Sequence, residues 1–145
     1  MKYKIKVWKT LSRNDTGETN SHQSGISIVK DIARAGIFPI LTTDTLNPRT
    51  DVSFYDEKGQ KWTFKYIYYN DLFFGKEKSK GHDEFRLTCV KDFIRANDIM
   101  AGDEIWFAIN DSGERIIGFN KQNNSEDDSN DDVIVIRKGW KMINI

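Results

Sequence analysis

The sequence predicts a mainly β domain, of a barrel-like or sandwich type, built from about seven short strands and two short helices. Three observations lead to this prediction. Short segments alternate apolar and polar residues, turn-forming residues separate these segments, and 12% of the residues are aromatic. The length of 145 residues suits a single domain, residues 1–145, with a core of its own.

The first half of the chain begins with a strand over residues 3–11, because Lys alternates there with apolar residues. A second short strand is expected at 25–29, followed by a short helix at 30–36 that ends at a glycine. Residues 50–70 read as a β-hairpin with its turn at 57–60. In its second arm four aromatic residues share one face, and we expect them in the core rather than stacked on single-stranded bases. They are Trp62, Phe64, Tyr66 and Tyr68.

The second half continues the β pattern. Residues 83–90 predict a strand with Phe85, Leu87 and Cys89 on one face, and a second short helix is expected at 91–100. Three further segments read as strands. They are residues 101–110, 115–120 and 133–138. The terminal GWKMINI is also apolar and strand-like.

Composition permits nucleic-acid binding without demanding it. The 22 basic and 22 acidic residues cancel, but five acids lie in the single run SEDDSNDD at 125–132, which leaves 22 basic against 17 acidic residues elsewhere. We expect this run to be a loop pointing away from any duplex. The single Cys89 fits a reducing cytoplasm, and two histidines with one cysteine are too few for a structural zinc site. No signal peptide or membrane span is expected.

Two long polar connections are the distinctive feature of the sequence. The first, LSRNDTGETNSHQSGI, is residues 11–26, and the second, NDLFFGKEKSKGHD, is residues 70–83. Connections of this length are usually either functional or disordered. Their Lys and Arg side chains can neutralise phosphates, and their Arg, Asn, Gln and Glu side chains can pair with base edges. A solvated polar surface is the alternative reading of the same residues.

The first connection resembles the N-terminal effector domain of EcoRII-type restriction endonucleases, through its N-D-T-G and H-Q-x-G elements. A second block, IYYNDLFFGK followed by EFRLT, resembles the I-Y-Y-N, F-G-K and E-x-R-x-T sequence of that family. The AGDEIWFAI segment is similar to a strand entry of the plant B-three transcription-factor domains. The resemblance covers most of residues 3–110. Two departures from the family pattern are Thr19-Asn20-Ser21, where the family has T-G-G, and extra residues at 78–83.

The resemblance implies a DNA-binding pseudobarrel, a seven-stranded open barrel with two short helices, that reads a short duplex site in the major groove through two arms. It implies that the chain is part of a larger type II restriction endonuclease of a bacterial restriction-modification system. Its partners would be double-stranded DNA and a nuclease domain or subunit, with no membrane, and the domain itself would be a monomer. Binding would need no cofactor, and Mg²⁺ would be needed only in the separate nuclease domain.

The candidate DNA-binding residues form two sets, which we call the first arm (residues 13–24) and the second arm (residues 70–86). The first-arm candidates are Arg13, Asn14, Asp15, Thr19, Asn20, Ser21, His22, Gln23 and Ser24. The second-arm candidates are Lys76, Lys78, Lys80, His82, Glu84, Phe85 and Arg86. By resemblance, His22 matches a DNA-contacting histidine, Lys76 the lysine of F-G-K, and Glu84 and Arg86 the charged residues of E-x-R.

Four of these candidates have a plainer alternative. Strand alternation places Arg86 on the outward face, where it could bind guanine while Glu84 accepts from cytosine, but the two could also form an ordinary surface ion pair. Asp15, with Gly17, could shape a turn at the base of the first arm instead of contacting DNA. His82 could contact a phosphate or simply be solvated.

A different function class is also open at this point. Asp51, Asp56 and Lys58 are the nearest approach to the carboxylates and lysine of a Mg²⁺-dependent nuclease. Asp56 and Lys58 fall in the predicted hairpin turn, and Asp51 is too close in sequence for the usual insertion. We therefore expect that this chain does not cut DNA. A protein-interaction module that lost DNA binding is a third alternative, and the intact arms argue against it.

Overall fold

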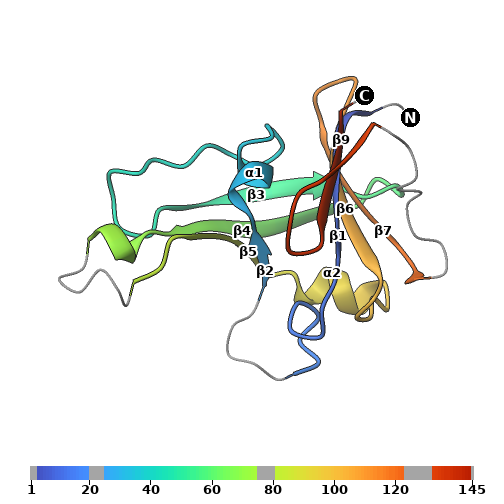
Figure 1. Ribbon diagram of the computed structural model, residues 1–145. Helices are drawn as coiled ribbons and strands as arrows, with labels where there is room; N and C mark the ends of the chain where they lie inside the picture. The colour runs from blue at the N-terminus through green and yellow to red at the C-terminus, as the bar shows by residue number, and fades with distance from the viewer. Residues whose placement is uncertain (1–2, 20–24, 75–80, 123–131, 145) are drawn as a thin grey trace.

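The computed structural model describes residues 3–19, 25–74, 81–122 and 132–144, and its described strands form one strongly curved sheet (Figure 1). The strand order is β2-β5-β4-β3-β7-β6-β1-β9-β8. All neighbouring strands pair antiparallel except β3 and β7, which are parallel and paired only at Tyr55 and Ile116. The sheet therefore has two halves, β2-β5-β4-β3 and β7-β6-β1-β9-β8, which meet at a narrow seam.

The described strands are nine in number, with two α-helices and one short 3₁₀ helix between them. The strands are β1 (Tyr3–Thr10), β2 (Ile26–Ile28), β3 (Arg49–Tyr55), β4 (Lys61–Tyr69), β5 (Glu84–Thr88), β6 (Glu104–Asn110), β7 (Arg115–Asn120), β8 (Val133–Val135) and β9 (Trp140–Asn144). The helices are α1 (Lys30–Ala33), η1 (Asp71–Phe73) and α2 (Lys91–Ala96). None of these helices is long and apolar enough to span a membrane.

The core fills the inside of the curved sheet and is mainly aromatic. Phe38 lies at its centre, stacked on Tyr66 with ring centroids 5.2 Å apart and in edge contact with Phe54 and Phe107. Away from the β3–β7 seam, Trp140 of β9 donates from Nε1 to the carbonyl oxygen of Ser27 in β2, at 3.1 Å. This contact brings the two sheet halves together across the core, so the sheet curls into an open barrel.

The mainly β open-barrel prediction is confirmed, as is the core position of the aromatic face of β4. Phe64, Tyr66 and Tyr68 are buried, and Trp62 packs half-buried against Phe93 of α2. The hairpin of β3 and β4 also has its turn where expected, since the Asp56 backbone N–H donates to the carbonyl of Gln60 at 2.9 Å.

Two sequence-based expectations are corrected. The described residues contain nine strands rather than about seven, and the strand expected at 133–138 ends at Val135. Lys138 and Gly139 take positive φ in the turn that follows, and the strand-like terminal segment forms β9. The strand expected at 83–90 ends at Thr88. Cys89 has a φ of +65° and is exposed, so it does not share the inward face with Phe85 and Leu87.

Candidate nucleic-acid interface

The outward face of the β2-β5-β4-β3 half carries the residues singled out in E-x-R. Leu87 is fully buried and Phe85 packs on the core, so Glu84, Arg86 and Thr88 lie on the opposite face. Their β4 partners on that face are Tyr69, Ile67 and Lys65 respectively. Arg49 of β3 is exposed and pairs with Ile67, so the face carries three cations, Lys65, Arg86 and Arg49.

A groove of about 510 Å³ opens on this outward face, next to the point where the first arm enters β2. Ile67 and Tyr69 line it from β4, and Gly25, Thr88 and Lys91 line it from the other elements. The groove lies between the attachment points of the two arms, since Gly25 follows the first arm and Tyr69 precedes the second.

Arg86 connects the ends of the two arms. Its guanidinium donates to the carbonyl oxygen of Gly25 at 3.3 Å and to Oε1 of Glu84 at 2.8 Å. The Arg86 side chain is 12% exposed and that of Glu84 is 32% exposed. The face predicted for Arg86 is correct, and on it the side chain is engaged with protein groups rather than extended into solvent.

Gly25 is required where the first arm enters β2. Its φ is +103°, a conformation that side chains with a Cβ rarely adopt, and a Cβ here would lie 2.5 Å from the carbonyl oxygen of Leu87. The glycine lets the chain pass directly over β5 and places its own carbonyl against Arg86. The position was visible in the sequence as the glycine of H-Q-x-G, but its packing partner was not.

The base of the first arm is held by a buried ion pair. Asp15 accepts from Nζ of Lys9 at 2.7 Å, with both side chains less than a tenth exposed. Asp15 Oδ2 also accepts from the Ser12 backbone N–H at 2.9 Å, while Ser12 Oγ accepts from the Asp15 backbone N–H at 3.2 Å. This reciprocal pattern is that of a capping box, and it shapes the turn at the base of the arm. It gives Asp15 a role in shaping the arm, and the Ser-x-x-Asp spacing was its signal in the sequence.

The rest of the described first arm is a series of turns. Arg13 is exposed, and Thr19 donates from its hydroxyl to Oδ1 of Asn14 at 3.0 Å. Eight of the candidates lie outside the described residues. They are Asn20, Ser21, His22, Gln23 and Ser24 in the first arm and Lys76, Lys78 and Lys80 in the second.

The second arm starts from a buried asparagine. Asn70 is 1% exposed, and its side chain accepts from the Asn47 backbone N–H at 2.7 Å and donates to the Thr45 carbonyl at 2.8 Å. The Asn70 backbone N–H donates in turn to Oδ1 of Asn47 at 3.1 Å. These bonds fix the loop before β3 to the start of η1. Sequence analysis missed them because the two asparagines are 23 positions apart.

The two sides of the second arm are joined at its neck. The His82 backbone N–H donates to Asp71, and the His82 ring Nδ1 lies 3.2 Å from both carboxylate oxygens. The backbone hydrogen bond and then the ring contact hold the pKa of Asp71 below its usual value. The Leu72 backbone N–H donates to the His82 carbonyl at 3.1 Å. His82 is exposed, as expected of a loop histidine, and contacts Asp71.

Asp83 fixes the return of the second arm to the sheet. It accepts from the hydroxyl of Tyr68 at 2.6 Å and from Nζ of Lys30 in α1 at 2.5 Å. Burial alone would raise the pKa of Asp83, but the hydrogen bonds from Lys30 and Tyr68 outweigh it and lower the pKa. Burial, and then the hydrogen bond to Asp83, raises the pKa of Tyr68 to about 12.

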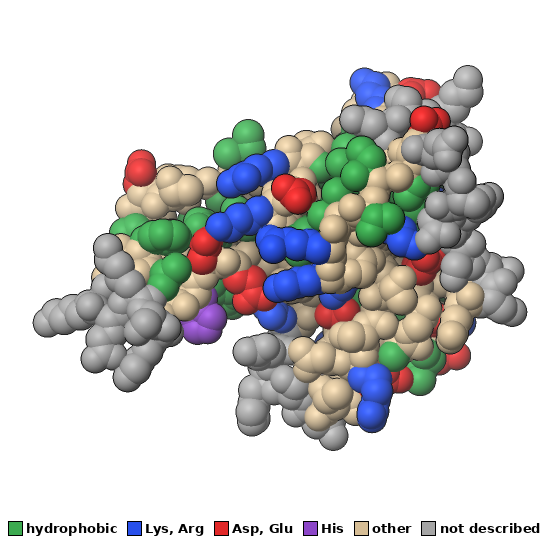
Figure 2. All heavy atoms as spheres, viewed as in Figure 1, with side chains coloured by type: hydrophobic (Ala, Val, Ile, Leu, Met, Phe, Trp, Pro, Cys, Tyr) green, Lys and Arg blue, Asp and Glu red, His purple; other side chains and the backbone are tan. Residues whose placement is uncertain are grey.

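Basic side chains gather on one part of the surface. Figure 2 shows Lys and Arg side chains concentrated where Figure 1 draws α1, β2 and the β8–β9 hairpin, with acidic side chains among them. One of these elements, β2, pairs with β5, the strand that carries Arg86. The net charge of zero for the whole chain therefore does not describe this part of the surface.

Asp56, the central residue of the nuclease alternative, holds the β3–β4 turn. Its carboxylate accepts from the backbone N–H groups of Lys58 and Gln60, both at 2.9 Å, and from Trp62 Nε1 at 3.0 Å. Burial would raise the pKa of Asp56, and these hydrogen bonds lower it instead.

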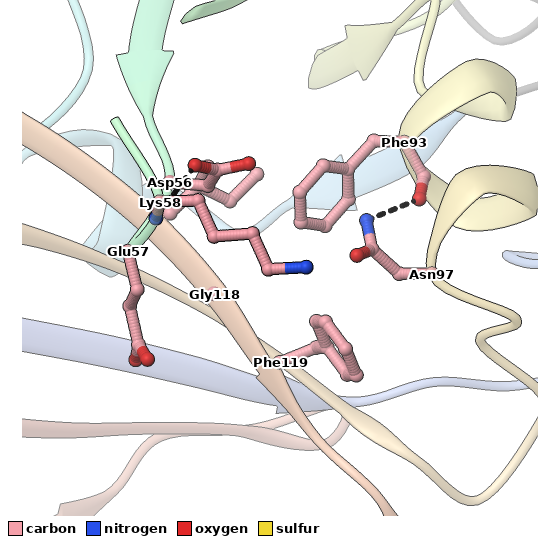
Figure 3. A pocket seen from close by; sticks show the side chains of 8 residues that line it. Asp56, Glu57, Lys58, Phe93, Asn97, Gly118 and Phe119 are labelled. Atoms are coloured by element: carbon pink, nitrogen blue, oxygen red, sulfur yellow. Dashed lines mark hydrogen bonds between the residues drawn. The ribbon is translucent and has the colours of Figure 1, made fainter. Parts of the chain in front are cut away.

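The other two residues of the nuclease alternative have different neighbours. Figure 3 shows the Lys58 side chain lying over a small pocket beside Phe93 and Phe119. Asp51 lies 3.5 Å from Nζ of Lys65. In the described ranges no three His, Cys, Asp or Glu residues lie close enough to hold a metal ion.

The family model described as "Restriction endonuclease EcoRII, N-terminal" matches residues 2–104. The chain belongs to this family. The match includes both arms and the outward face between them, and it confirms the resemblance seen in the sequence. The chain is therefore a DNA-binding, effector-type domain of a restriction endonuclease with a pseudobarrel fold.

Two solved structures resemble the domain. One is the complex of Arabidopsis FUS3 with DNA, at 22% identity and a TM-score of 0.56, with 79% of this chain and 94% of that chain covered. The other is the B3 domain of the UbaLAI restriction endonuclease with cognate DNA, at 18% identity and a TM-score of 0.47, covering 79% and 65%. The likeness to the FUS3 structure shows that this chain and FUS3 share a fold. The curated proteins contain no match.

Proposed function

We propose that this EcoRII-type domain binds a short specific site in double-stranded DNA, with both arms entering the major groove, as the target-recognition part of a type II restriction endonuclease. The observation that carries this proposal is Arg86, which contacts the end of the first arm at Gly25 and Glu84 at the end of the second. Recognition by two loops is tighter when their relative position is fixed before binding, because ordering them afterwards costs conformational entropy.

The proposed roles divide between position and sequence. Lys76, Lys78 and Lys80 bind phosphates and set the register of the duplex. The first-arm side chains, above all Arg13, His22 and Gln23, meet base edges together with Glu84 and Arg86. Arg bidentate to guanine and Glu accepting from cytosine N4 are common pairings in the major groove.

Other first-arm residues support these contacts. Asn14 and Thr19 bond to each other, Asp15 anchors the arm to Lys9, and Asn20, Ser21 and Ser24 continue it toward Gly25. In the second arm Phe85 stacks on Tyr68 with ring centroids 4.3 Å apart, which fixes the strand that presents Glu84 and Arg86. His82 holds the neck through Asp71 and lies close enough to the lysines in sequence to add a phosphate contact.

Selection of bound duplexes from a randomised library, at near-physiological salt and against excess non-specific DNA, tests this function directly. We expect enrichment of one short site and a specific Kd at least about 1,000-fold below the non-specific Kd. Weak binding that depends only on salt, without an enriched site, would overturn the proposal.

The same preparation tests the remaining parts of the proposal. The nuclease centre is placed in another domain or subunit, so EDTA should leave the Kd for the selected site unchanged and added Mg²⁺ should produce no cleavage. We propose that the domain itself binds as a monomer, which light scattering of the free and DNA-bound protein checks. Cleavage that the Asp56→Ala variant abolishes without weakened binding would instead favour a nuclease centred on Asp56.

A further inference from the structure

The second arm exposes two adjacent aromatic side chains that the proposed contacts do not use. Phe73 is 57% exposed and Phe74 is 48% exposed, at the end of η1. Figure 1 places η1 at the far end of the β4–β5 pair, and Figure 2 shows hydrophobic side chains on the surface at that end. Together the two adjacent phenyl groups form a small apolar patch on an otherwise polar arm, where a ligand can cover them.

The backbone beneath these two residues is held rigidly. The Phe73 N–H donates to the Asn70 carbonyl at 3.0 Å, and Asn70 is itself bonded to the loop before β3. Gly81 packs so closely against Leu72 that a Cβ would lie 2.2 Å from the Leu72 Cα. The arm therefore carries the aromatic pair in a fixed position instead of folding it onto the core.

The size of the exposed surface and its chemical context indicate the ligand. Two half-exposed phenyl groups offer roughly 200 Å², well below the roughly 800 Å² per partner of a stable protein interface. The sequence continues with three lysines, at 76, 78 and 80, within six residues of Phe74. An apolar pair that is followed in the sequence by these proposed phosphate-binding lysines suits the one apolar substituent in the major groove, the C5-methyl group of thymine.

We propose that Phe73 and Phe74 contact thymine C5-methyl groups in the bound duplex, so that the second arm selects thymine at one or two positions of the site. This inference rests on the proposed function and adds a specificity contact that is independent of hydrogen bonds. Removing a buried methyl group from such a contact weakens binding by about four-fold.

The test replaces each thymine of the selected site, one at a time, by deoxyuridine, which removes only the methyl group. For the unmutated domain we expect one or two positions at which the Kd rises about four-fold. In Phe73→Ala or Phe74→Ala the same replacement should leave the Kd unchanged. Tyr55→Ala is the matched control. Tyr55 is an aromatic residue that is 39% exposed and lies at the end of β3 that is remote from η1. Its replacement should leave the dependence of the Kd on the thymine methyl group unchanged.

The outcomes separate this inference from the function on which it rests. No enriched site at all would mean that the proposed function has failed. Specific binding without methyl dependence at any thymine, or methyl dependence that both alanine variants retain, would overturn only the role of the two phenylalanines. A change in oligomeric state in the alanine variants, with DNA binding intact, would also overturn it and would assign the pair to a protein contact.

Discussion

Asp15 shows how a single residue in a DNA-binding arm can act without contacting DNA. Its carboxylate is buried, paired with Lys9, and bonded to the Ser12 backbone. The Lys9 side chain is less than a tenth exposed, and the carboxylate of Asp15 is the counterion of its buried ammonium group. Such a pair contributes little relative to apolar residues, but removing one partner leaves a buried charge without its counterion.

Asp15→Ala should therefore lower the free energy of unfolding by about 3 kcal/mol, as for other broken buried pairs. Urea denaturation at pH 7 measures this. Asp51→Ala is the control, because the Asp51–Lys65 pair is exposed and its loss should cost less than about 1 kcal/mol. Equal effects of the two substitutions would show that the Lys9–Asp15 pair does not anchor the arm.

Arg86 carries a second prediction at this scale. Arg86→Ala should reduce the ratio of specific to non-specific affinity by about ten-fold or more, because a bidentate contact to guanine contributes roughly 1–3 kcal/mol of discrimination. Lys76→Ala should instead weaken all duplexes alike and lower the slope of log K against log salt by about one. Titrations of the selected site and of unrelated DNA at several salt concentrations distinguish the two. Unchanged site preference in Arg86→Ala would remove it from the recognition surface.

Residue positions were predictable from the sequence where strand alternation decides them, and not where distant segments meet. Alternation correctly placed Arg86 opposite Leu87. It could not show that the guanidinium would bond to Gly25, because that contact spans 61 positions and depends on how β2 pairs with β5. Asn70 and Asn47 were missed for the same reason.

At the scale of elements, the attachment of the first arm depends on the β2–β5 junction. Gly25→Ala should lower the free energy of unfolding by about 1–3 kcal/mol through backbone strain, with a further loss from the contact with the Leu87 carbonyl. It should also raise the Kd for the selected site, because the Gly25 carbonyl positions the arm against Arg86.

Gly17→Ala is the matched control for this substitution. Gly17 also has a positive φ, +82°, but a Cβ there would meet no atom within 4 Å. Its loss should cost about 1 kcal/mol, from strain alone. Thermal unfolding of both variants checks the comparison, and similar destabilisation by the two would mean that the approach to β5 is unimportant.

Elements with strong periodicity were predicted well, and those set by a turn were not. The β3–β4 hairpin follows directly from its alternating aromatic residues and its Gly59 turn. In the C-terminal hairpin the first strand was expected over residues 133–138, but β8 ends at Val135, and three residues are too few to show where a strand ends. Its turn uses Lys138 with a φ of +53°, a conformation that a lysine does not signal in the sequence.

The whole molecule should lose stability in acid because several aspartates are ionised more readily when folded. Asp103 is the best buried of them. It accepts from the backbone N–H groups of Met100 and Gln122, both at 2.8 Å, and from Lys121. Burial would raise the pKa of Asp103, but the hydrogen bonds from Lys121 and then the backbone outweigh it and lower the pKa. Asp56, Asp71 and Asp83 are lowered as well.

A lowered folded-state pKa contributes stability above the unfolded value of 3.8, and this contribution is lost as the pH falls through the folded-state pKa. Urea denaturation from pH 6 to pH 2.5 should show a steep loss below about pH 4. Asp103→Asn should be less stable at pH 6 and should fall less steeply below that point. A parallel decline in the variant would show that Asp103 does not contribute to acid unfolding.

The seam between β3 and β7 has a mechanical consequence for the molecule. One paired position joins the sheet halves there, and Trp140 with Ser27 joins them on the other side of the core. The first arm runs from β1 in one half to β2 in the other, whereas the second arm belongs to a single half. The relative orientation of the two halves therefore sets the span between the arms. Since the major groove of B-DNA is about 12 Å wide, this orientation helps determine which duplex geometry the domain accepts.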